Sequence, residues 1–221
     1  MKIIRKKSEK SLIDQFIRDF KKDYLRKKKQ NKRLSFVLTG GKSPIKLYRR
    51  LAQINVDWNI IDLFWGDERY VSHQSRNSNF KLAFNEFIKK IEIDKKNVFP
   101  IKTNKSISKC SADYSKEIRK YFKYKKINFD YCLLGMGKDG HIASIFPNSK
   151  YLYNKFITKP VTRRDFKRIT LSLNVINNSK KIFLWLNNKS KSKTYLKIKK
   201  EGKKIPVNNL NSRKTIIYKI N

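Results

Sequence analysis

Acid–base chemistry is available in one short stretch of the chain, "LLGMGKDGHIASIFP" at residues 133–147. One of the two histidines, His141, stands there two residues after Asp139, and Gly137 and Gly140 permit a strained turn around them. Because an imidazole titrates near neutral pH, His141 is our candidate for a group that accepts a proton.

The immediate surroundings of His141 leave its protonation open. We expect a helix to begin here, with Asp139 as its cap and His141 in its first turn, where the helix N-terminus disfavours imidazolium. Asp139 would act in the opposite direction if it lay close to the ring. A histidine that only forms a structural hydrogen bond at a turn is the alternative interpretation. The second histidine, His73, has no comparable context.

Anion binding is suggested by "TGGKSP", residues 39–44. Gly40 and Gly41 would let the backbone approach a phosphate closely, Ser43 adds a hydroxyl, and the N-terminus of a following helix offers free N–H groups. The spacing of glycine and lysine is not that of a Walker loop. The alternative is a tight strand-to-helix turn that needs glycine for shape alone.

Charged side chains stand side by side in "WGDERYV", residues 65–71. Neighbours in sequence point in different directions, so Asp67, Glu68 and Arg69 cannot all enter one pocket. We expect Asp67 to face a ligand, and Glu68 and Arg69 to pair with other loops. A solvated charged loop is the alternative.

Two further cations could clamp a phosphate. Arg168 stands at the start of the expected strand 168–173, and Lys191 stands near a helix start in "NNKSKSK". Arginine binds phosphate in a planar, bidentate way and lysine binds it as a point charge. For any single lysine of this chain, a solvated surface position is the alternative.

Strands and helices alternate along the chain. Expected helices cover 8–29, 44–51, 78–91 and 108–124, expected strands cover 34–39, 60–65, 129–135, 182–187 and 214–220, and 151–173 is irregular until the strand at its end. The strands are continuously apolar, which is typical of a parallel sheet covered on both faces. We therefore predict one α/β domain over residues 1–221, with a Rossmann-like, mostly parallel sheet and helices on both faces.

The polar loops described above share a position relative to this sheet. The stretches "TGGKSP", "WGDER", "LGMGKDGH" and "NNKSK" each follow the carboxyl end of a strand. Ligands of such sheets bind outside the carboxyl ends of the strands. We expect the four loops to converge on one site.

The charge of the chain is unusual, with 55 Lys and Arg against 17 Asp and Glu and a formal net charge of +38. Clustered cations bind nucleic acid, yet the lysines are spread over helices, loops and both termini, and no nucleic-acid-binding motif accompanies them. We expect no specific nucleic-acid partner, although non-specific polyanion binding stays open. Such a field should attract any small phosphorylated molecule.

Localisation is suggested by what the sequence does not contain. No apolar run approaches the length of a membrane span, and the N-terminus has no apolar signal segment. Cys110 and Cys132 match no metal or redox spacing. We expect a reduced, cytoplasmic protein with no membrane partner.

Four blocks together resemble a known family: "LTGGKSPIKLYRRL", "WGDERYV…SRNSNF", "FDYCLLGMGKDGHIASIFP" and "KRITLSLNVINNSKKIFLWLNNKSKSK". They are similar to the 6-phosphogluconolactonase family, which is related to the glucosamine-6-phosphate isomerase/deaminases, over about residues 8–220. The resemblance implies hydrolysis of 6-phospho-D-glucono-1,5-lactone to 6-phosphogluconate, the second step of the oxidative pentose phosphate route. It implies no metal and no organic cofactor.

The resemblance also implies roles for individual residues. It makes His141 the base that activates water and places Asp67 and Arg69 in the active-site loop. The residues that would contact the sugar phosphate are Gly40, Gly41, Ser43, Arg168 and Lys191. Three positions depart from the family pattern: Lys42 replaces a small hydroxyl residue, Ile142 a threonine and Asn148 a glycine. We interpret Ile142 and Asn148 as drift, whereas Lys42 adds a charge beside the phosphate loop.

Two rival functions remain open at this point. An amino-sugar phosphate deaminase/isomerase on the same scaffold would need several acid–base groups around the sugar, and no second acidic residue follows shortly after His141. A polyanion-binding protein on an inherited enzyme scaffold would account for the charge.

Overall fold

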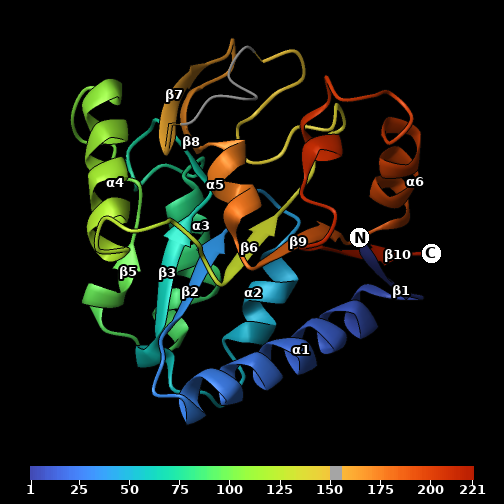
Figure 1. Ribbon diagram of the computed structural model, residues 1–221, viewed down its shortest axis with the longest axis horizontal. Coiled ribbons are helices and arrows are strands. Elements are labelled where there is room, and N and C mark those ends of the chain that lie inside the picture. The colour runs from blue at the N-terminus through green and yellow to red at the C-terminus, as the bar shows by residue number, and fades with distance from the viewer. Residues whose placement is uncertain (150–155) are drawn as a thin grey trace.

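A seven-stranded sheet forms the centre of the computed structural model, which describes residues 1–149 and 156–221 (Figure 1). Every pair of neighbouring strands in this sheet is parallel. In spatial order the strands are β1 (Lys2–Lys6), β10 (Thr215–Ile220), β9 (Lys181–Leu186), β6 (Tyr131–Leu134), β2 (Leu34–Leu38), β3 (Ile61–Trp65) and β5 (Val98–Phe99). The predicted α/β fold with a mostly parallel sheet is confirmed.

Helices pack on both faces of this sheet. In α1 (Glu9–Lys29) the ring of Phe16 lies 6.5 Å from that of Phe36, whereas at the end of α4 (Ile107–Tyr121) the ring of Tyr121 lies 4.9 Å from that of Phe64. Phe36 pairs in register with Leu63, so the next residue, Phe64, points to the opposite face. Long aromatic side chains therefore bury both surfaces of the sheet.

The remaining helices are shorter. They are α2 (Ile45–Leu51), α3 (Asn79–Glu86), α5 (Leu173–Asn178) and α6 (Lys189–Ile198). The predicted helices at 8–29, 44–51, 78–91 and 108–124 are present, although α3 ends several residues earlier than expected. Helix α1 begins at a capping box in which the Ser8 side chain accepts from the Ser11 N–H.

A second, antiparallel sheet was not predicted. It contains β4 (Asp67–Arg69), β8 (Lys167–Leu171) and β7 (Thr158–Thr162) in that order. The expected strand at 168–173 therefore lies outside the main sheet, the expected loop "WGDER" contains a strand, and part of the expected irregular stretch is a hairpin. The part of that stretch at residues 151–155 lies outside the described residues.

The helix expected after Gly140 is absent, which corrects the prediction for His141. The chain instead makes a tight turn in which the Ile142 and Ile145 backbones exchange hydrogen bonds of 3.3 and 2.9 Å. Ala143 in this turn has φ of 47°, a left-handed conformation that a helix cannot contain. Apolar spacing alone did not reveal this, because Ile142 and Ile145 are buried as a helical face would be.

Buried tyrosines hold the carboxyl ends of two central strands. The Tyr48 hydroxyl accepts from the Thr39 N–H at 3.0 Å and donates to the Thr39 carbonyl at 2.6 Å, just after β2. The Tyr114 hydroxyl forms the same pair of bonds with Trp65, the last residue of β3, at 2.9 and 3.1 Å. Each hydroxyl thereby satisfies backbone groups at the point where the ladder of the sheet ends.

Candidate active site

A cavity of about 210 Å³ opens at the carboxyl ends of β2, β3, β6 and β9. The cavity is lined by all eight residues to which the family resemblance gave a role: Gly40, Gly41, Ser43, Asp67, Arg69, His141, Arg168 and Lys191. The predicted convergence of the four loops is therefore confirmed. Further lining residues are Thr39, Lys42, Asn79, Gly135, Met136, Gly137, Ala143 and Ser144.

His141 is held by Asp139. The Nδ1 atom of the ring lies 2.6 Å from Asp139 Oδ1, and the same oxygen accepts from the His141 backbone N–H at 3.2 Å. Because an ionised carboxylate only accepts hydrogen bonds, Nδ1 is the donor and a neutral ring carries its lone pair on Nε2. The side chain is 34% exposed. Asp139 is an orienting partner of the ring and not the helix cap that we predicted.

Gly137 makes room for this histidine. A Cβ atom added to Gly137 would lie 2.2 Å from both Cε1 and Nδ1 of the His141 ring, and 2.8 Å from Asp139 Oδ1. The Gly137 N–H also donates to the His141 carbonyl at 3.0 Å. Only a residue without a side chain allows the ring, the carboxylate and the backbone to pack in this way.

The small antiparallel sheet turns alternate side chains toward the cavity. Asp67 pairs in register with Thr170, and Arg69 pairs with Arg168. Residues two apart in a strand point to the same face, so Asp67, Arg69 and Arg168 share one face, and all three line the cavity. Arg69 was expected to pair with another loop, and it does so as well: its Nη1 donates to the Asn77 carbonyl at 2.8 Å.

Glu68 points to the opposite face and pairs with another loop, as predicted. Its carboxylate accepts from the backbone N–H groups of Asn79 and Phe80, each at 2.7 Å, and from the Ser78 hydroxyl at 3.0 Å. Burial raises the pKa of Glu68 to about 7, although these donors act to lower it. The carboxylate thus fixes the start of α3 against β4.

Asp67 is fixed by two side chains that sequence reasoning did not assign. The Ser144 hydroxyl donates to Asp67 Oδ2 at 2.5 Å, and the Asn79 amide donates to the Asp67 carbonyl at 3.0 Å and to Oδ1 at 3.3 Å. Burial raises the pKa of Asp67, and the Ser144 hydrogen bond and the nearby arginines oppose that rise. Both residues stand in the blocks that resemble the family, Asn79 in "SRNSNF" and Ser144 in "FDYCLLGMGKDGHIASIFP", but neither was given a role from the sequence.

The glycine loop lies against Asn79 and Lys191. A Cβ atom on Gly40 would lie 1.9 Å from Asn79 Oδ1, so this position also requires glycine. The Lys191 ammonium donates to the Ser43 hydroxyl, which joins the loops after β2 and β9. Desolvation lowers the pKa of Lys191, as expected for a cation partly withdrawn from water. A Lys–Ser pair beside free glycine backbone is suited to binding a phosphate.

Arg168 is more enclosed than its predicted role as a simple clamp suggests. Its side chain is 10% exposed, and its two terminal nitrogens donate to the Asp165 carboxylate at 2.8 and 2.6 Å. The guanidinium therefore lowers the pKa of Asp165. An anion that binds Arg168 must share it with this carboxylate or replace it.

Arginines and phenylalanines alternate beside the cavity. The guanidinium of Arg168 lies 5.5 Å from the ring centre of Phe146 and 5.7 Å from that of Phe166. Arg163 lies 4.4 Å from the Phe146 ring, and Arg69 lies 5.6 Å from the Phe166 ring. Cation–π contacts of this kind hold the guanidinium groups in fixed planes.

The same stack reaches the histidine. The rings of His141 and Phe146 have centres 4.6 Å apart, so Phe146 contacts both the candidate base and the Arg168 cation. Phe146 was not a candidate residue in the sequence. The position of its ring depends on the turn at 142–145, where we predicted a helix.

The three departures have different structural contexts. Lys42 is exposed and lines the cavity, so its charge is added to the phosphate loop as expected. Ile142 is fully buried in the core. Asn148 has φ of 57°, the left-handed region that glycine prefers and asparagine tolerates, which explains the exchange better than drift does.

Possible metal ligands, the cysteines and the helices of the described part of the chain have the following arrangement. Within residues 1–149 and 156–221, no three His, Cys, Asp or Glu side chains gather as they would around a metal ion. Both cysteines are free and buried. No helix among these residues is long and apolar enough to cross a membrane.

Known proteins resemble this chain over most of its length. A profile of the family described as glucosamine-6-phosphate isomerases/6-phosphogluconolactonase matches residues 7–218. The chain is 34% identical over 167 residues to the 6-phosphogluconolactonase of Thermotoga maritima, covering 75% of this chain and 74% of that protein. It is 33% identical over 164 residues to the 6-phosphogluconolactonase of Synechocystis sp., covering 71% and 68%.

Solved structures extend the similarity to the whole fold. The crystal structure of the Thermotoga maritima 6-phosphogluconolactonase has a TM-score of 0.85 at 26% identity and covers 99% of this chain and 98% of that one. The crystal structure of a 6-phosphogluconolactonase from Shewanella baltica, at 22% identity, shares the fold with a TM-score of 0.86 over 100% and 98% of the chains. This chain belongs to the glucosamine-6-phosphate isomerase/6-phosphogluconolactonase family.

Proposed function

We propose that the protein is a 6-phosphogluconolactonase that hydrolyses 6-phospho-D-glucono-1,5-lactone to 6-phosphogluconate, with His141 as the general base. The observation that carries the proposal is the geometry of His141, whose Nδ1 is committed to Asp139 and whose Nε2 is free to accept a proton. Cations for a phosphate line the same cavity, which is the pairing of groups that a phosphorylated lactone requires.

The reaction begins with water beside His141. Nε2 takes a proton from the water as its oxygen attacks C1 of the lactone, and the carbonyl electrons move to form a tetrahedral oxyanion. Arg69 is the cavity cation that we assign to this oxyanion, because it is fixed by Asn77 and by stacking on Phe166. Collapse of the intermediate breaks the bond from C1 to the ring oxygen, which takes the proton from His141, and 6-phosphogluconate is released.

Asp139 and Asp67 support this step in different ways. Asp139 keeps the imidazole in one tautomer and stabilises the imidazolium formed after proton transfer, as the aspartate does in a serine-protease triad. Asp67 lies among Arg69 and Arg168 on the cavity face of the small sheet and offers an acceptor for substrate hydroxyls.

The phosphate binds at the other side of the cavity. We assign its contacts to the Lys191 ammonium, the Ser43 hydroxyl and the backbone of Gly40 and Gly41, with Arg168 as a further cation. An activated ester needs no nucleophilic serine or cysteine, and both cysteines are buried and free. Binding of the remote phosphate holds the lactone carbonyl near His141.

The test is the exchange of each histidine in turn. His141→Ala should lower kcat by roughly 10²–10⁴-fold, the usual contribution of a general base, with KM little changed. His73→Ala is the matched control, because His73 contacts the Ile101 carbonyl at 2.9 Å and does not line the cavity. Turnover of the His141 variant close to that of the control, after subtraction of spontaneous hydrolysis, would overturn the assignment.

The deaminase reaction, which the family name also includes, can be distinguished from lactone hydrolysis by its product. A deaminase would release ammonia from glucosamine 6-phosphate, and a lactonase would not. We expect no ammonia above background from the unmodified protein, together with acid release from the lactone. Ammonia release without lactone hydrolysis would replace our proposal with the deaminase reaction.

A further inference from the structure

Two basic segments meet at the edge of the sheet opposite the active site. The end of α1 leads into β2, and the end of α4 leads into β6. Strands β2 and β6 are parallel neighbours, so the two segments enter the sheet side by side at its amino edge. We call the exposed cations of these segments the basic rim: Lys28, Lys29, Lys32, Arg119, Lys120, Lys123, Lys125 and Lys126.

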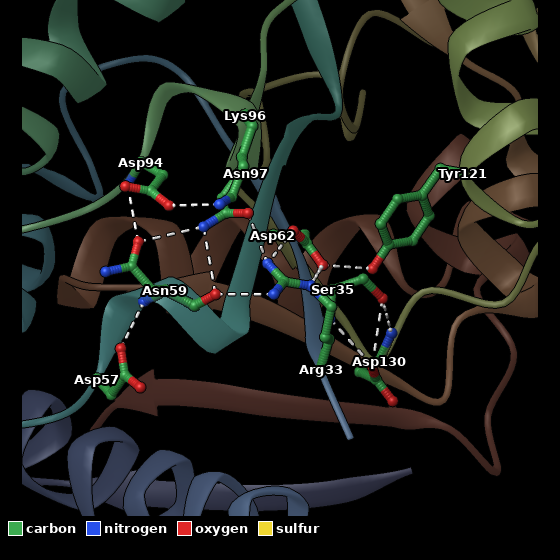
Figure 2. A network of polar contacts seen from close by, with 10 residues as sticks. All are labelled: Arg33, Ser35, Asp57, Asn59, Asp62, Asp94, Lys96, Asn97, Tyr121 and Asp130. Atoms are coloured by element: carbon green, nitrogen blue, oxygen red, sulfur yellow. Dashed lines mark hydrogen bonds and ion pairs between the residues drawn. The ribbon is translucent and has the colours of Figure 1, made fainter. Parts of the chain in front are cut away.

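A polar network joins the two segments (Figure 2). Asp62 at the start of β3 accepts two hydrogen bonds from Arg33, at 2.7 and 2.5 Å, and a third from the Tyr121 hydroxyl at 2.7 Å. Arg33 follows α1 and Tyr121 ends α4. The network therefore joins the residue that enters β2 to the end of α4, between the two halves of the basic rim.

A second carboxylate strengthens the junction. Asp130, just before β6, forms an ion pair of 2.7 Å with Lys27 of α1, and it accepts from the Ser35 N–H at 3.0 Å. Asp62 and Asp130 are both buried, and their acceptors are taken by these partners. Asp130 also pairs with Lys180 at 2.8 Å, and neither carboxylate forms an ion pair with a cation of the basic rim.

The charge of the basic rim is accordingly uncompensated. Every one of its cations is exposed, and none forms an ion pair with another residue of the described chain. The sequence between Tyr24 and Arg33 contains no acidic residue, and neither does the sequence between Ile118 and Phe129. A closely spaced group of such cations displaces counterions from the backbone of a polyanion.

An aromatic ring stands in the middle of these lysines. Tyr124 is 74% exposed, the most exposed of the large hydrophobic side chains in the described chain. Lys123 and Tyr124 have φ of 49° and 59°, and the Tyr124 N–H closes the helix on the Arg119 carbonyl at 2.8 Å. Two successive left-handed residues other than glycine are costly. They end the helix at a point where the Tyr124 side chain is exposed.

We propose that the basic rim binds single-stranded nucleic acid, with its lysines on the phosphates and Tyr124 stacked on an unpaired base. A groove of cations with an aromatic platform is the recognition mode of proteins that bind single strands without sequence preference. A small anion would use the charge but not the exposed ring. The rim lies at the amino edge of the sheet and the catalytic cavity at its carboxyl edge, so both can be occupied together.

Two triple variants of equal charge separate the basic rim from the charge of the whole chain. The first is Lys123→Gln with Lys125→Gln and Lys126→Gln. The control is Lys197→Gln with Lys199→Gln and Lys200→Gln, exposed lysines at the end of α6, which stands at the opposite side of the molecule from α4 (Figure 1). Binding to a fluorescent 20-nucleotide oligo(rU) is measured by anisotropy across a salt series.

The expected results differ between the two variants. If the three lysines replaced in the first variant all contact phosphates, the magnitude of the salt slope of log K should fall by about 2 in that variant and by much less in the control. Each phosphate contact on a single strand contributes about 0.7 to this slope. Equal losses in both variants would mean diffuse attraction and would overturn the proposal. Absence of binding by the unmodified protein at about 0.15 M salt would overturn it as well.

The tyrosine provides a test that charge alone cannot pass. Tyr124→Ala should weaken oligo(rU) binding roughly 5- to 100-fold, whereas Tyr124→Phe should keep it, since the ring and not the hydroxyl stacks. Heparin and anionic vesicles, which offer charge without bases, should be bound equally by all three proteins. A Tyr124→Ala variant that binds like the unmodified protein would overturn the stacking contact and with it the proposal.

Oligo(dT) in place of oligo(rU) shows whether the ribose matters, and the shared chemistry of phosphates and unpaired bases predicts binding of both. The kcat of lactone hydrolysis by the Tyr124 and lysine variants should equal that of the unmodified protein, since none of these residues lines the cavity. A Tyr124 or lysine variant that loses nucleic-acid binding but keeps lactonase activity would separate this inference from the proposed enzyme function. A His141 variant that loses lactonase activity but keeps nucleic-acid binding would separate them as well.

Discussion

The smallest part of the proposed mechanism is the contact of an imidazole with a glycine. Gly137→Ala should displace the His141 ring, because the new Cβ would lie 2.2 Å from two of its atoms. A misplacement of about 1 Å costs on the order of 100-fold in rate, so kcat should fall by about that factor while KM changes little. Gly135→Ala is the matched control, since its Cβ would meet only Thr39 Oγ1, at 3.8 Å. Similar kcat values for the two variants would show that the ring is not held by this contact.

The phosphate contacts are tested by two single exchanges. Arg168→Ala and Lys191→Ala should each raise KM for the phosphorylated lactone by roughly 10- to 150-fold, because a hydrogen bond to a charged group contributes about 1.5–3 kcal/mol. Unphosphorylated gluconolactone should be affected much less. Equal losses on both substrates would assign these side chains to the fold or to the chemistry. A structural role is the stronger alternative for Arg168 than for Lys191, because Asp165, Phe146 and Phe166 already contact Arg168.

Helices and strands position the side chains of the site, and an exchange of Tyr48 tests the role of one strand, β2. Tyr48→Phe leaves the buried Thr39 N–H without its partner, which should cost about 1–3 kcal/mol of unfolding free energy. The freed end of β2 carries Gly40, Gly41 and Ser43, so KM should rise as well. Tyr218→Phe removes a hydroxyl bond to Asp19 far from the cavity and should lower stability without raising KM. Denaturant unfolding and steady-state kinetics measure the two effects.

The junction of β4 with α3 should respond to pH. The folded pKa of Glu68, about 7, is above the ordinary value of 4.5, so the folded state binds this proton more tightly than the unfolded state does. The contribution is fully present below pH 4.5 and is lost as pH rises through 7; at about 1.4 kcal/mol per pKa unit it is of order 3–4 kcal/mol. Glu68→Gln should remove that part of the pH dependence. The prediction would be contradicted if the unfolding free energy of Glu68→Gln changed between pH 5 and 8 by as much as that of the unmodified protein.

The strands that we predicted from the sequence are those whose side chains are apolar on both faces of the main sheet. Continuous apolar runs located β2, β3, β6, β9 and β10, and the glycines that follow some of them located the site. The small antiparallel sheet was missed because Asp67 and Arg69 of β4 face a polar cavity and β7 contains Pro160. No apolar alternation marks strands of this kind. Ser144 reaches Asp67 only through the unpredicted turn that begins at Ile142.

For the molecule as a whole, the +38 charge and the catalytic cavity should be separable. Replacing Lys28, Lys29 and Lys32 by glutamine should leave kcat unchanged, lower kcat/KM modestly and reduce its sensitivity to salt, because the overall field speeds encounter with a dianionic substrate. Lys27 is kept, since its side chain is only 12% exposed and is paired with Asp130. A collapse of kcat in a variant with an unchanged melting temperature would mean that the basic surface takes part in the reaction.

The parallel pairing of the first and last strands has a consequence for how the chain is made. Strand β1 forms one edge of the main sheet, and its partner is β10, with Lys2 opposite Ile216. At a translation rate of roughly 5–20 residues per second, β1 leaves the ribosome roughly 10–40 seconds before that partner exists. An unpaired apolar strand would be an aggregation hazard over such a time, and the charges of Lys2, Arg5 and Lys6 are the kind that keep a waiting strand soluble. The cations of β1 thus protect this strand in the nascent chain until β10 is made and pairs with it.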